Sequence, residues 1–238
     1  MKLLVLAGGF GTRLKTIVSD RPKPLAPIGD KPFLFLQIKS WKEQGFRTFI
    51  FLLHYQAIQI VEFITHAQRT SLLSDCEVQW IIEEEPLGTG GAVANAIRLL
   101  KIEEDFIIVN ADTWVESGLK RLAASTSPTI ALVNQENVAR YGQVIINTDY
   151  QVIQFKEKSI HGNSGLISTG CLKLHPKTFS SYFNKAISLE TEIIPQIVNQ
   201  GILSAIELET RFIDIGIPED YKRFCEWVDQ PSQKEELI

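Results

Sequence analysis

A run of glycines near the amino terminus has the composition of an anion-binding loop. Residues 3–6 are continuously apolar, as in a short buried strand, and three glycines follow directly: Gly8, Gly9 and Gly11. Glycine lets the backbone adopt positive φ and approach a ligand closely, and successive amides in such a loop form a concavity that binds anions. Thr12 and Arg13 add a hydroxyl and a planar guanidinium. The stretch therefore predicts a phosphate-binding loop.

Two familiar glycine loops do not fit this stretch. The dinucleotide-binding fingerprint requires a third glycine where the chain has Leu14, and the P-loop requires Gly-Lys-Ser or Gly-Lys-Thr after its glycines. Farther along, Lys23 stands between Pro22 and Pro24, which fix their own φ and bias the preceding residues toward extended backbone. A stiff segment of this kind would keep the lysine aimed at one place. A rigid surface loop with a solvated lysine remains the alternative.

Two aspartates follow apolar runs and could bind a metal ion. Asp112 comes soon after residues 106–109, a predicted strand, and Asp214 lies between apolar neighbours ahead of Gly216. Magnesium is usually held by one or two carboxylates together with substrate phosphates and water. Singly, each aspartate would more often cap a turn or a helix. Together with a phosphate-binding loop, the pair predicts a magnesium site.

Three glutamates, at residues 83–85, directly follow another largely apolar run at residues 78–82. Carboxylates would repel a phosphate, but a carboxylate only accepts hydrogen bonds and so suits guanine, whose N1–H and amino group are adjacent donors. Glu83 stands nearest the strand and is the predicted base-reading residue. Glu84 and Glu85 can equally be solvated surface side chains.

The composition excludes several classes of protein. At 238 residues and 45% hydrophobic content, the chain fits a globular enzyme. No apolar run reaches membrane-spanning length and no secretory leader is recognisable, so no membrane association is expected. Three scattered cysteines indicate reduced thiols and a cytoplasmic location. The net charge of −4 argues against nucleic-acid binding, while the seven Lys/Arg and two Asp of residues 1–40 make the glycine-loop end electropositive.

Apolar runs alternate with stretches of helical spacing through the first half of the chain. Continuously apolar strands are typical of a parallel sheet buried on both faces, so the order indicates a doubly wound, mainly parallel α/β sheet, with a smaller antiparallel extension after about residue 135. Ligands of such sheets bind at the carboxyl ends of the strands, where the glycine loop, residues 83–91 and residues 110–113 would lie. The expected strands are 3–6, 49–53, 78–82, 106–109, 129–133, 144–147, 152–155 and 166–174. The expected helices are 33–44, 58–66, 91–100, 176–183, 191–200 and 218–228. We expect one domain at residues 1–229 and a frayed tail at 230–238.

These stretches resemble the sugar-1-phosphate nucleotidylyltransferase family. The resemblance rests on G-G-F-G-T-R-L, on the P-K-P lysine and on P-L-G-T-G-G-A at residues 86–92, and it extends from residue 2 to about 228. With V-S-D-x-P-K-P-L-A-P at 18–27, S-L-E at 188–190 and F-I-D-I-G-I-P-E-D-Y at 212–221, the chain looks closest to D-glycero-α-D-manno-heptose 1-phosphate guanylyltransferases. The resemblance implies a Rossmann-like, GT-A-like fold whose antiparallel extension faces the sugar.

The resemblance also implies a role for each matching residue. Arg13 and Lys23 would be catalytic, and Asp112 and Asp214 would hold Mg²⁺. Nucleotide contacts are implied at Leu6, Gly8, Gly9, Gly11, Thr12, Glu83, Leu87 and Gly88. Contacts with the sugar and its phosphate are implied at Asp112, Gly142, Glu157, Lys158, Ser168 and Thr169. Three positions depart from the family pattern: Ala111 replaces a common glycine, Ser159 a usual proline and Ser168 a sugar-contacting asparagine.

The implied activity is that of a nucleotidyltransferase of EC 2.7.7 type. It transfers a nucleoside monophosphate, GMP by resemblance, from GTP or another NTP to a sugar 1-phosphate, and gives a GDP-sugar for surface polysaccharide synthesis and pyrophosphate. An enzyme that uses dTTP or UTP and a hexose 1-phosphate is the alternative. A glycosyltransferase would more often show D-x-D, and a non-catalytic regulatory subunit would be expected to lack one of Arg13, Lys23, Asp112 or Asp214, all of which are present. The sugar and any homo-oligomer are left open by the sequence.

Overall fold

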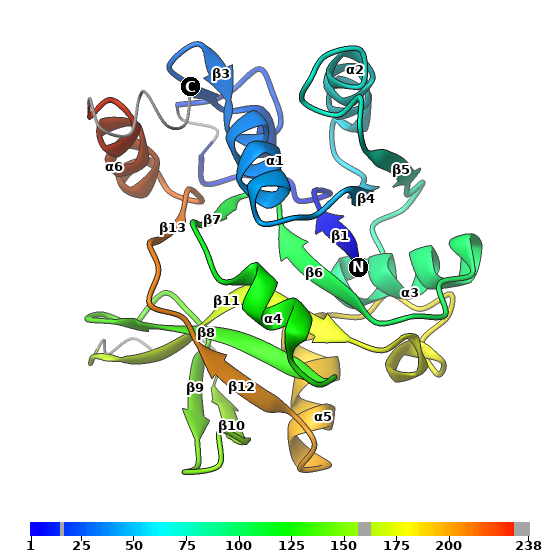
Figure 1. The fold of residues 1–238 in the computed structure, drawn as a ribbon, viewed down its shortest axis with the longest axis vertical. Coiled ribbons are helices and arrows are strands. Elements are labelled where there is room, and N and C mark those ends of the chain that lie inside the picture. The colour runs from blue at the N-terminus through cyan, green and yellow to red at the C-terminus, as the bar shows by residue number, and fades with distance from the viewer. Residues whose placement is uncertain (15–16, 157–162, 231–238) are drawn as a thin grey trace. The chain divides into compact units, whose positions relative to one another are not determined.

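The computed structural model describes residues 1–14, 17–156 and 163–230. The chain forms two compact units, which we describe separately. The glycine-loop unit comprises Lys2–Glu84, Asn110–Ser117 and Arg211–Ile238, and the hairpin unit comprises Glu85–Val109 and Gly118–Thr210, with Met1. Figure 1 labels most of the helices and strands of both units. No helix within the described residues is long and apolar enough to cross a membrane.

The glycine-loop unit is built on parallel strands. β1 (Lys2–Leu6) pairs in parallel with β4 (Thr48–Leu53), and β4 pairs in parallel with β5 (Glu77–Ile82). β1 and β4 are buried along most of their length, as their continuous apolar sequences predict. β5 is exposed or half-buried throughout, so the prediction that it is buried on both faces is wrong. The glutamate and glutamine in its sequence, Glu77 and Gln79, fit this exposed position.

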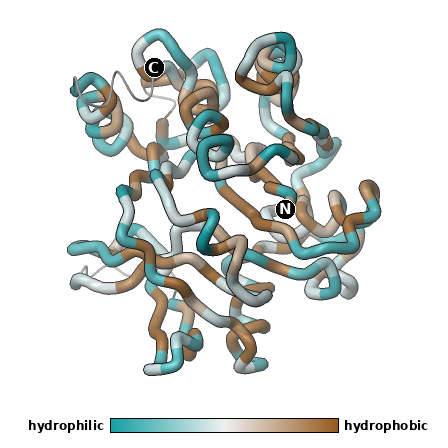
Figure 2. The backbone as a smooth tube through the Cα atoms, in the orientation of Figure 1, coloured by the Kyte–Doolittle hydropathy of each residue, from teal (hydrophilic) through white to brown (hydrophobic). Residues whose placement is uncertain are grey.

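Helices and short strands complete this unit. The helices are α1 (Phe33–Glu43), α2 (Ala57–Ala67) and α6 (Pro218–Val228), and a single 3-10 turn, η1, spans Lys23–Leu25. β7 (Thr113–Val115) pairs antiparallel with β13 (Phe212–Asp214), and β2 (Pro27–Ile28) pairs antiparallel with β3 (Lys31–Pro32). Along α2 and α6 the tube in Figure 2 alternates between hydrophobic and hydrophilic colours, as expected for helices with one buried face.

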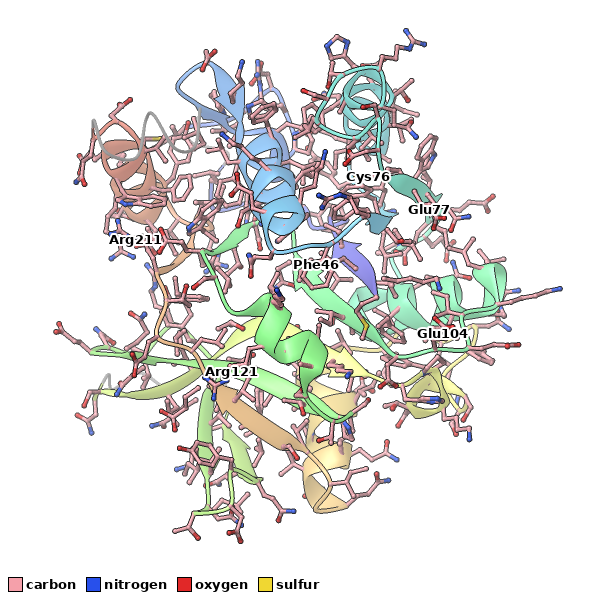
Figure 3. All side chains as sticks on the ribbon, viewed as in Figure 1. Phe46, Cys76, Glu77, Glu104, Arg121 and Arg211 are labelled. Carbon is pink, nitrogen blue, oxygen red and sulfur yellow. The ribbon has the colours of Figure 1, made fainter. Side chains whose placement is uncertain are left out.

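An aromatic core joins these elements. Phe224 of α6 packs against Phe33 of α1 and against Trp114 of β7, with ring centroids 5.0 and 5.4 Å apart. Trp227, one turn later, lies 5.3 Å from Phe224, and the guanidinium of Arg211, which Figure 3 labels, lies 4.3 Å from the centroid of the Trp227 ring. Aromatic burial of this extent is a large hydrophobic contribution. It fixes β7 and β13 against α1 and α6.

The hairpin unit is organised around its longest strand, β11 (Gly165–Leu174). β11 pairs antiparallel with β6 (Phe106–Asn110), β8 (Thr129–Gln135) and β9 (Gln143–Ile146), and β9 forms a hairpin with β10 (Val152–Lys156). β12 (Ser204–Glu207) pairs in parallel with β8. Arg121, labelled on α4 in Figure 3, donates a hydrogen bond to the carbonyl of Glu207 at 2.8 Å. The helical segments are α3 (Gly88–Leu100), α4 (Leu119–Ala124), η2 (Pro176–Phe179), η3 (Leu189–Ile193) and α5 (Ile194–Asn199).

The predicted order of strands and helices is confirmed through the first half of the chain, and the mixed α/β class with it. Four details differ. α3 begins at Gly88, three residues before the predicted start, and the helix expected at 176–183 is only the 3-10 segment η2. The helix expected at 191–200 is divided into the π-helical η3 and α5, and β8, expected among parallel strands, pairs antiparallel with β11. Six short elements were not predicted from the sequence: β2, β3, β7, β12, β13 and α4.

Candidate active site

The glycine loop leaves β1 with its backbone amides unused. Ala7 still donates to the carbonyl of Leu52 at 2.9 Å, but within the described residues no N–H group from Gly8 to Arg13 donates a hydrogen bond. Gly11 has φ +59°, and a Cβ there would stand 3.4 Å from the Cβ of Lys23. Thr12 and Arg13 are exposed. A run of open amides beside an exposed guanidinium is chemically suited to a polyanion.

Lys23 lies beneath this loop and points at a carboxylate. Its Nζ lies 2.6 Å from Oδ2 of Asp112, and its side chain is only 12% exposed. Pro22 is extended, as predicted, but Lys23 itself begins the 3-10 turn η1 rather than continuing an extended segment. Pro24 and Leu25 of that turn are buried, which anchors the lysine. The solvated-lysine alternative is therefore wrong.

The backbone of the turn that carries Asp112 is fixed by hydrogen bonds to β1, to the segment after β13 and to α1. The neighbouring amide of Ala111 donates to Leu6 of β1 at 3.0 Å, and the carbonyl of Asp112 accepts from Ile215 at 3.0 Å. Gln37 of α1, 1% exposed, donates both amide hydrogens to the carbonyls that flank the turn, those of Asn110 (3.0 Å) and Thr113 (2.9 Å). Gln37 was not predicted from the sequence, where its only signal is a single amide inside an apolar helical stretch.

Asp214 is the last residue of β13 and faces the same turn. Burial, and next the negative charge of Asp112, raise the pKa of Asp214, while Lys23 and Arg13 act in the opposite direction. Its Oδ1 accepts a hydrogen bond from the amide of Gly216 at 2.7 Å. A Cβ on Gly216 would stand 2.8 Å from that oxygen and 3.2 Å from Nζ of Lys23, so a larger residue there would displace one of these two side chains. Two carboxylates and two cations thus meet in the glycine-loop unit.

This geometry fits a divalent metal ion. The half-buried carboxylate of Asp214, whose pKa is raised, is stabilised in its charged form by a nearby cation, and the ammonium of Lys23 lies 2.6 Å from the carboxylate of Asp112. Among the described residues no group of three His, Cys, Asp or Glu side chains converges to hold a metal by itself. Two carboxylates completed by substrate phosphates and water are the arrangement that Mg²⁺ commonly uses.

Glu83 lies at the end of β5 in the same unit. Its amide donates to the carbonyl of Leu53 at 2.9 Å, and its carbonyl lies 3.1 Å from Nδ1 of His54. His54 in turn packs against the glycine loop, because a Cβ on Gly8 would stand 3.2 Å from the Cβ of His54. Glu83 is half-buried, whereas Glu84 and Glu85 are exposed. The structure therefore places Glu83, but not its two neighbours, in contact with the ends of the parallel strands.

The remaining predicted contacts belong to the hairpin unit. Leu87 and Gly88 stand at the start of α3, and the carbonyl of Gly142 accepts from the amide of Ser168 at 3.1 Å. Ser168 begins an irregular stretch of β11, where strand pairing with β8 is interrupted. Thr169 is 1% exposed and donates to the carbonyl of Ala131 at 2.9 Å, so its hydroxyl is already used. Glu157 and Lys158 lie outside the described residues.

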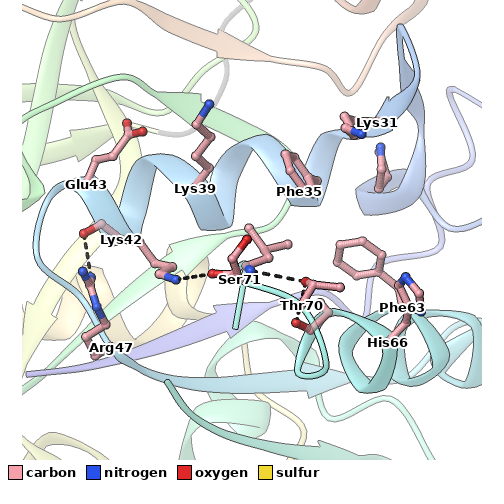
Figure 4. A pocket seen from close by; sticks show the side chains of 13 residues that line it. Lys31, Phe35, Lys39, Lys42, Glu43, Arg47, Phe63, His66, Thr70 and Ser71 are labelled. Carbon is pink, nitrogen blue, oxygen red and sulfur yellow. Dashed lines mark hydrogen bonds between the residues drawn. The ribbon is translucent and has the colours of Figure 1, made fainter. Parts of the chain in front are cut away.

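A groove of about 800 Å³ lies elsewhere in the glycine-loop unit, between α1 and α2 (Figure 4). Lys39 and Lys42 line one wall, and Phe63 and His66 the other. Lys42 is bonded to the carbonyl of Ser71 at 2.8 Å and to Asp75 at 2.5 Å, and Asp75 also accepts from Arg47 at 3.1 Å. Part of the groove's positive charge is thus neutralised by Asp75. None of the residues predicted to bind substrate is among those lining the groove.

Residues 2–229 match the nucleotidyl transferase family of proteins. The chain belongs to the nucleotidyl transferase family. It is therefore a nucleotidyltransferase, as predicted, and enzymes of this family generally use a divalent metal ion.

Individual relatives narrow the resemblance within the nucleotidyl transferase family. The D-glycero-alpha-D-manno-heptose 1-phosphate guanylyltransferase of Campylobacter jejuni is 35% identical over 94% of this chain and 98% of its own length. The mannose-1-phosphate guanyltransferase of Schizosaccharomyces pombe is 31% identical over 93% of this chain but only 62% of its own length. The crystal structure of HddC from Yersinia pseudotuberculosis, 35% identical, covers 96% of this chain and 99% of HddC with a TM-score of 0.84. A second HddC structure, complexed with GMP-PN, matches this chain with a TM-score of 0.82.

Proposed function

We propose that the chain transfers GMP from GTP to D-glycero-α-D-manno-heptose 1-phosphate, giving a GDP-sugar and pyrophosphate. Family membership, the heptose 1-phosphate guanylyltransferase of Campylobacter jejuni and the complex of HddC with GMP-PN support this substrate pair. The proposal treats residues 1–229 as one catalytic domain that works in the cytoplasm, where the three free cysteines would stay reduced.

In this proposal the glycine loop binds the outer phosphates of the nucleotide. The amides of Gly8, Gly9 and Gly11, with the hydroxyl of Thr12 and the guanidinium of Arg13, are assigned to the β- and γ-phosphates, and Leu6 contributes the end of β1. The open amides of this stretch support the assignment. Lys23 is assigned to the α-phosphate, where negative charge accumulates during the transfer.

Asp112 and Asp214 are assigned to the metal ion, proposed to be Mg²⁺. When bound, the ion supplies positive charge to the phosphates of both substrates. An ion held by these carboxylates would repel the ammonium of Lys23, which lies 2.6 Å from Asp112, so Lys23 would turn away from that carboxylate. Its four-carbon stem gives it the reach to turn toward the α-phosphate while η1 stays fixed.

The chemistry needs positioning more than proton transfer. A phosphate oxygen of the sugar 1-phosphate attacks the α-phosphorus in line, a new P–O bond forms, and the bond to the α,β-bridging oxygen breaks as pyrophosphate leaves. The nucleophile is already anionic, so no general base is needed. Arg13 and Lys23 hold the negative charge that develops, and the fixed loop aligns the reacting atoms.

Base and sugar recognition complete the assignment. The carboxylate of Glu83 would accept from N1–H and the amino group of guanine, and Leu87 and Gly88 would contact the base from the loop before α3. Gly142, Ser168 and Thr169 are assigned to the sugar, the last through its backbone because its hydroxyl is bonded to Ala131. Glu157 and Lys158 are assigned to the sugar hydroxyls and the sugar phosphate on the resemblance alone.

The observation that carries the proposal is the convergence of Lys23, Asp112 and Asp214 beneath a loop with open amides. Pyrophosphate release should be measured with Mg²⁺, each of GTP, UTP, dTTP, CTP and ATP, and a panel of sugar 1-phosphates that includes the heptose. The variant Asp112→Asn serves as the inactive control.

We expect release with GTP and the heptose, and none from the control. Release with UTP or dTTP and a hexose 1-phosphate would retain the mechanism and refute the role of Glu83. Nucleotide binding without any release would favour a non-catalytic subunit of the same fold. Loss of activity on treatment with a chelator, restored by Mg²⁺, would support the metal assignment.

A further inference from the structure

The loop before α3 is attached to a segment about 100 positions later in the chain. Within the hairpin unit, the amide of Ile187 donates to the carbonyl of Leu87 at 2.9 Å, and the carbonyl of Ile187 accepts from Gly90 (2.9 Å) and Gly91 (3.1 Å). Gly88 has φ +71°, and a Cβ there would stand 2.7 Å from the carbonyl oxygen of Ile187. The glycines of this loop therefore serve close backbone packing. They do not make it flexible.

One side-chain contact completes the attachment. Thr89, the second residue of α3, donates its hydroxyl to Oε2 of Glu190 at 2.7 Å, and its oxygen accepts from the amide of Leu189 at 2.8 Å. Ser188 donates to the same carboxylate oxygen at 3.0 Å and accepts from the amide of Thr191 at 3.2 Å. Glu190 thus receives two hydroxyl hydrogen bonds, and the direction of each is fixed because a carboxylate can only accept.

The charge of Glu190 is suited to this place. Hydrogen bonds to an ionised group are shorter and stronger than neutral ones, and the 2.7 Å distance from Thr89 is of the charge-assisted kind. A negative charge beside the first turn of a helix is also stabilised by the helix dipole. Both effects hold the first turn of α3 in one position, and with it the residues directly before it, Leu87 and Gly88.

We propose that Glu190 is a positioning residue for nucleobase binding, which acts through Thr89 to fix the Leu87–Gly88 loop. This rests on the proposed function, in which that loop contacts the base. Glu190 itself touches no substrate. The S-L-E and P-L-G-T-G-G-A stretches, far apart in the sequence, thereby have one joint purpose, which is to keep the base loop in its binding geometry before the nucleotide arrives.

The test separates nucleotide binding from catalysis. Thr89→Val removes the hydroxyl with little change of shape, Glu190→Ala removes the carboxylate, and Thr89→Ser restores the hydroxyl. We expect Thr89→Val and Glu190→Ala to raise the KM and the Kd for GTP roughly 10- to 100-fold, as for other residues that orient a binding group. The kcat and the KM for the sugar 1-phosphate should stay near the wild-type values, and Thr89→Ser should restore tight binding.

Thr129→Val is the matched control. Thr129 is buried in the same unit and donates its hydroxyl to Thr126 at 2.6 Å, so its loss should lower stability without changing the KM for GTP. Two results in the Thr89 and Glu190 variants would overturn the proposal. One is a fall in kcat together with a rise in the KM values of both GTP and the sugar 1-phosphate. The other is a loss of thermal stability with no change in the KM for GTP.

The outcome is independent of which base the enzyme uses. If the wild-type protein prefers another NTP, the guanine assignment fails, and the same variants are measured with that NTP. If the wild-type protein uses GTP and the variants bind it as tightly, the positioning role fails while the proposed function stands. Absence of binding to every NTP in an equilibrium titration would overturn both.

Discussion

Replacing Lys23 by methionine should lower turnover and strengthen metal binding at the same time. Methionine keeps an unbranched chain of similar length and removes the ammonium 2.6 Å from Asp112. Loss of one donor to the charge that develops in the transition state costs about 10²- to 10³-fold in kcat. We expect a fall of this size in pyrophosphate release, with a smaller rise in the KM for the nucleotide.

The effect on the metal has the opposite sign. In the proposed metal site, an ion would have to displace the ammonium from Asp112, whose side chain is 32% exposed beside a lysine that is 12% exposed. The free-energy contribution of a partly buried ion pair falls between two limits. Exposed pairs contribute under about 1 kcal/mol, and disruption of a buried pair costs about 3–5 kcal/mol. A net contribution of about 1–2 kcal/mol corresponds to roughly 5- to 30-fold tighter binding of the metal in Lys23→Met.

The assay is a titration with Mn²⁺ followed by electron paramagnetic resonance, without nucleotide, beside a kinetic assay on the same preparations. Lys39→Met is the matched control, because Lys39 is a lysine of α1 that lines the α1–α2 groove. The control should change neither quantity. Weaker Mn²⁺ binding in Lys23→Met, or an unchanged kcat, would refute the reasoning.

Two further outcomes are expected. Gln37→Leu should lower the free energy of unfolding by roughly 1–3 kcal/mol in a urea titration, because the carbonyls of Asn110 and Thr113 lose their donors; an unchanged midpoint would contradict this. A hydrogen bond from Lys42 lowers the pKa of Asp75 from 3.8 to about 2, so the stability it adds is present above pH 3.8 and is lost as the pH falls toward about 2. The small stability difference between the wild type and Asp75→Asn should therefore vanish in acid and shrink in salt, and a difference that grows toward pH 2 would count against the assignment.

The functional residues that can be predicted from the sequence are those with a recognisable pattern in their immediate neighbours. Gly8 to Arg13, Lys23 and Asp112 each stand beside a strand or a proline, and parallel strands end at one edge of a sheet, so their proximity follows from the order of elements. Gln37 could not be found this way, because its role depends on which turn lies opposite α1. The early start of α3 was missed for a similar reason. Glycine disfavours helix formation, so the glycines at 88, 90 and 91 predict a loop. Their packing and hydrogen bonds with Ile187 stabilise a helical turn there instead.

Glu190 also gives the two glycine-rich loops opposite electrical character. The first turn of a helix normally attracts anions, but at α3 a carboxylate already lies within 2.7 Å of Thr89. The loop from Gly8 to Arg13 instead ends in a cation. A phosphate brought to the first turn of α3 would therefore meet a negative charge where most helices offer a positive end.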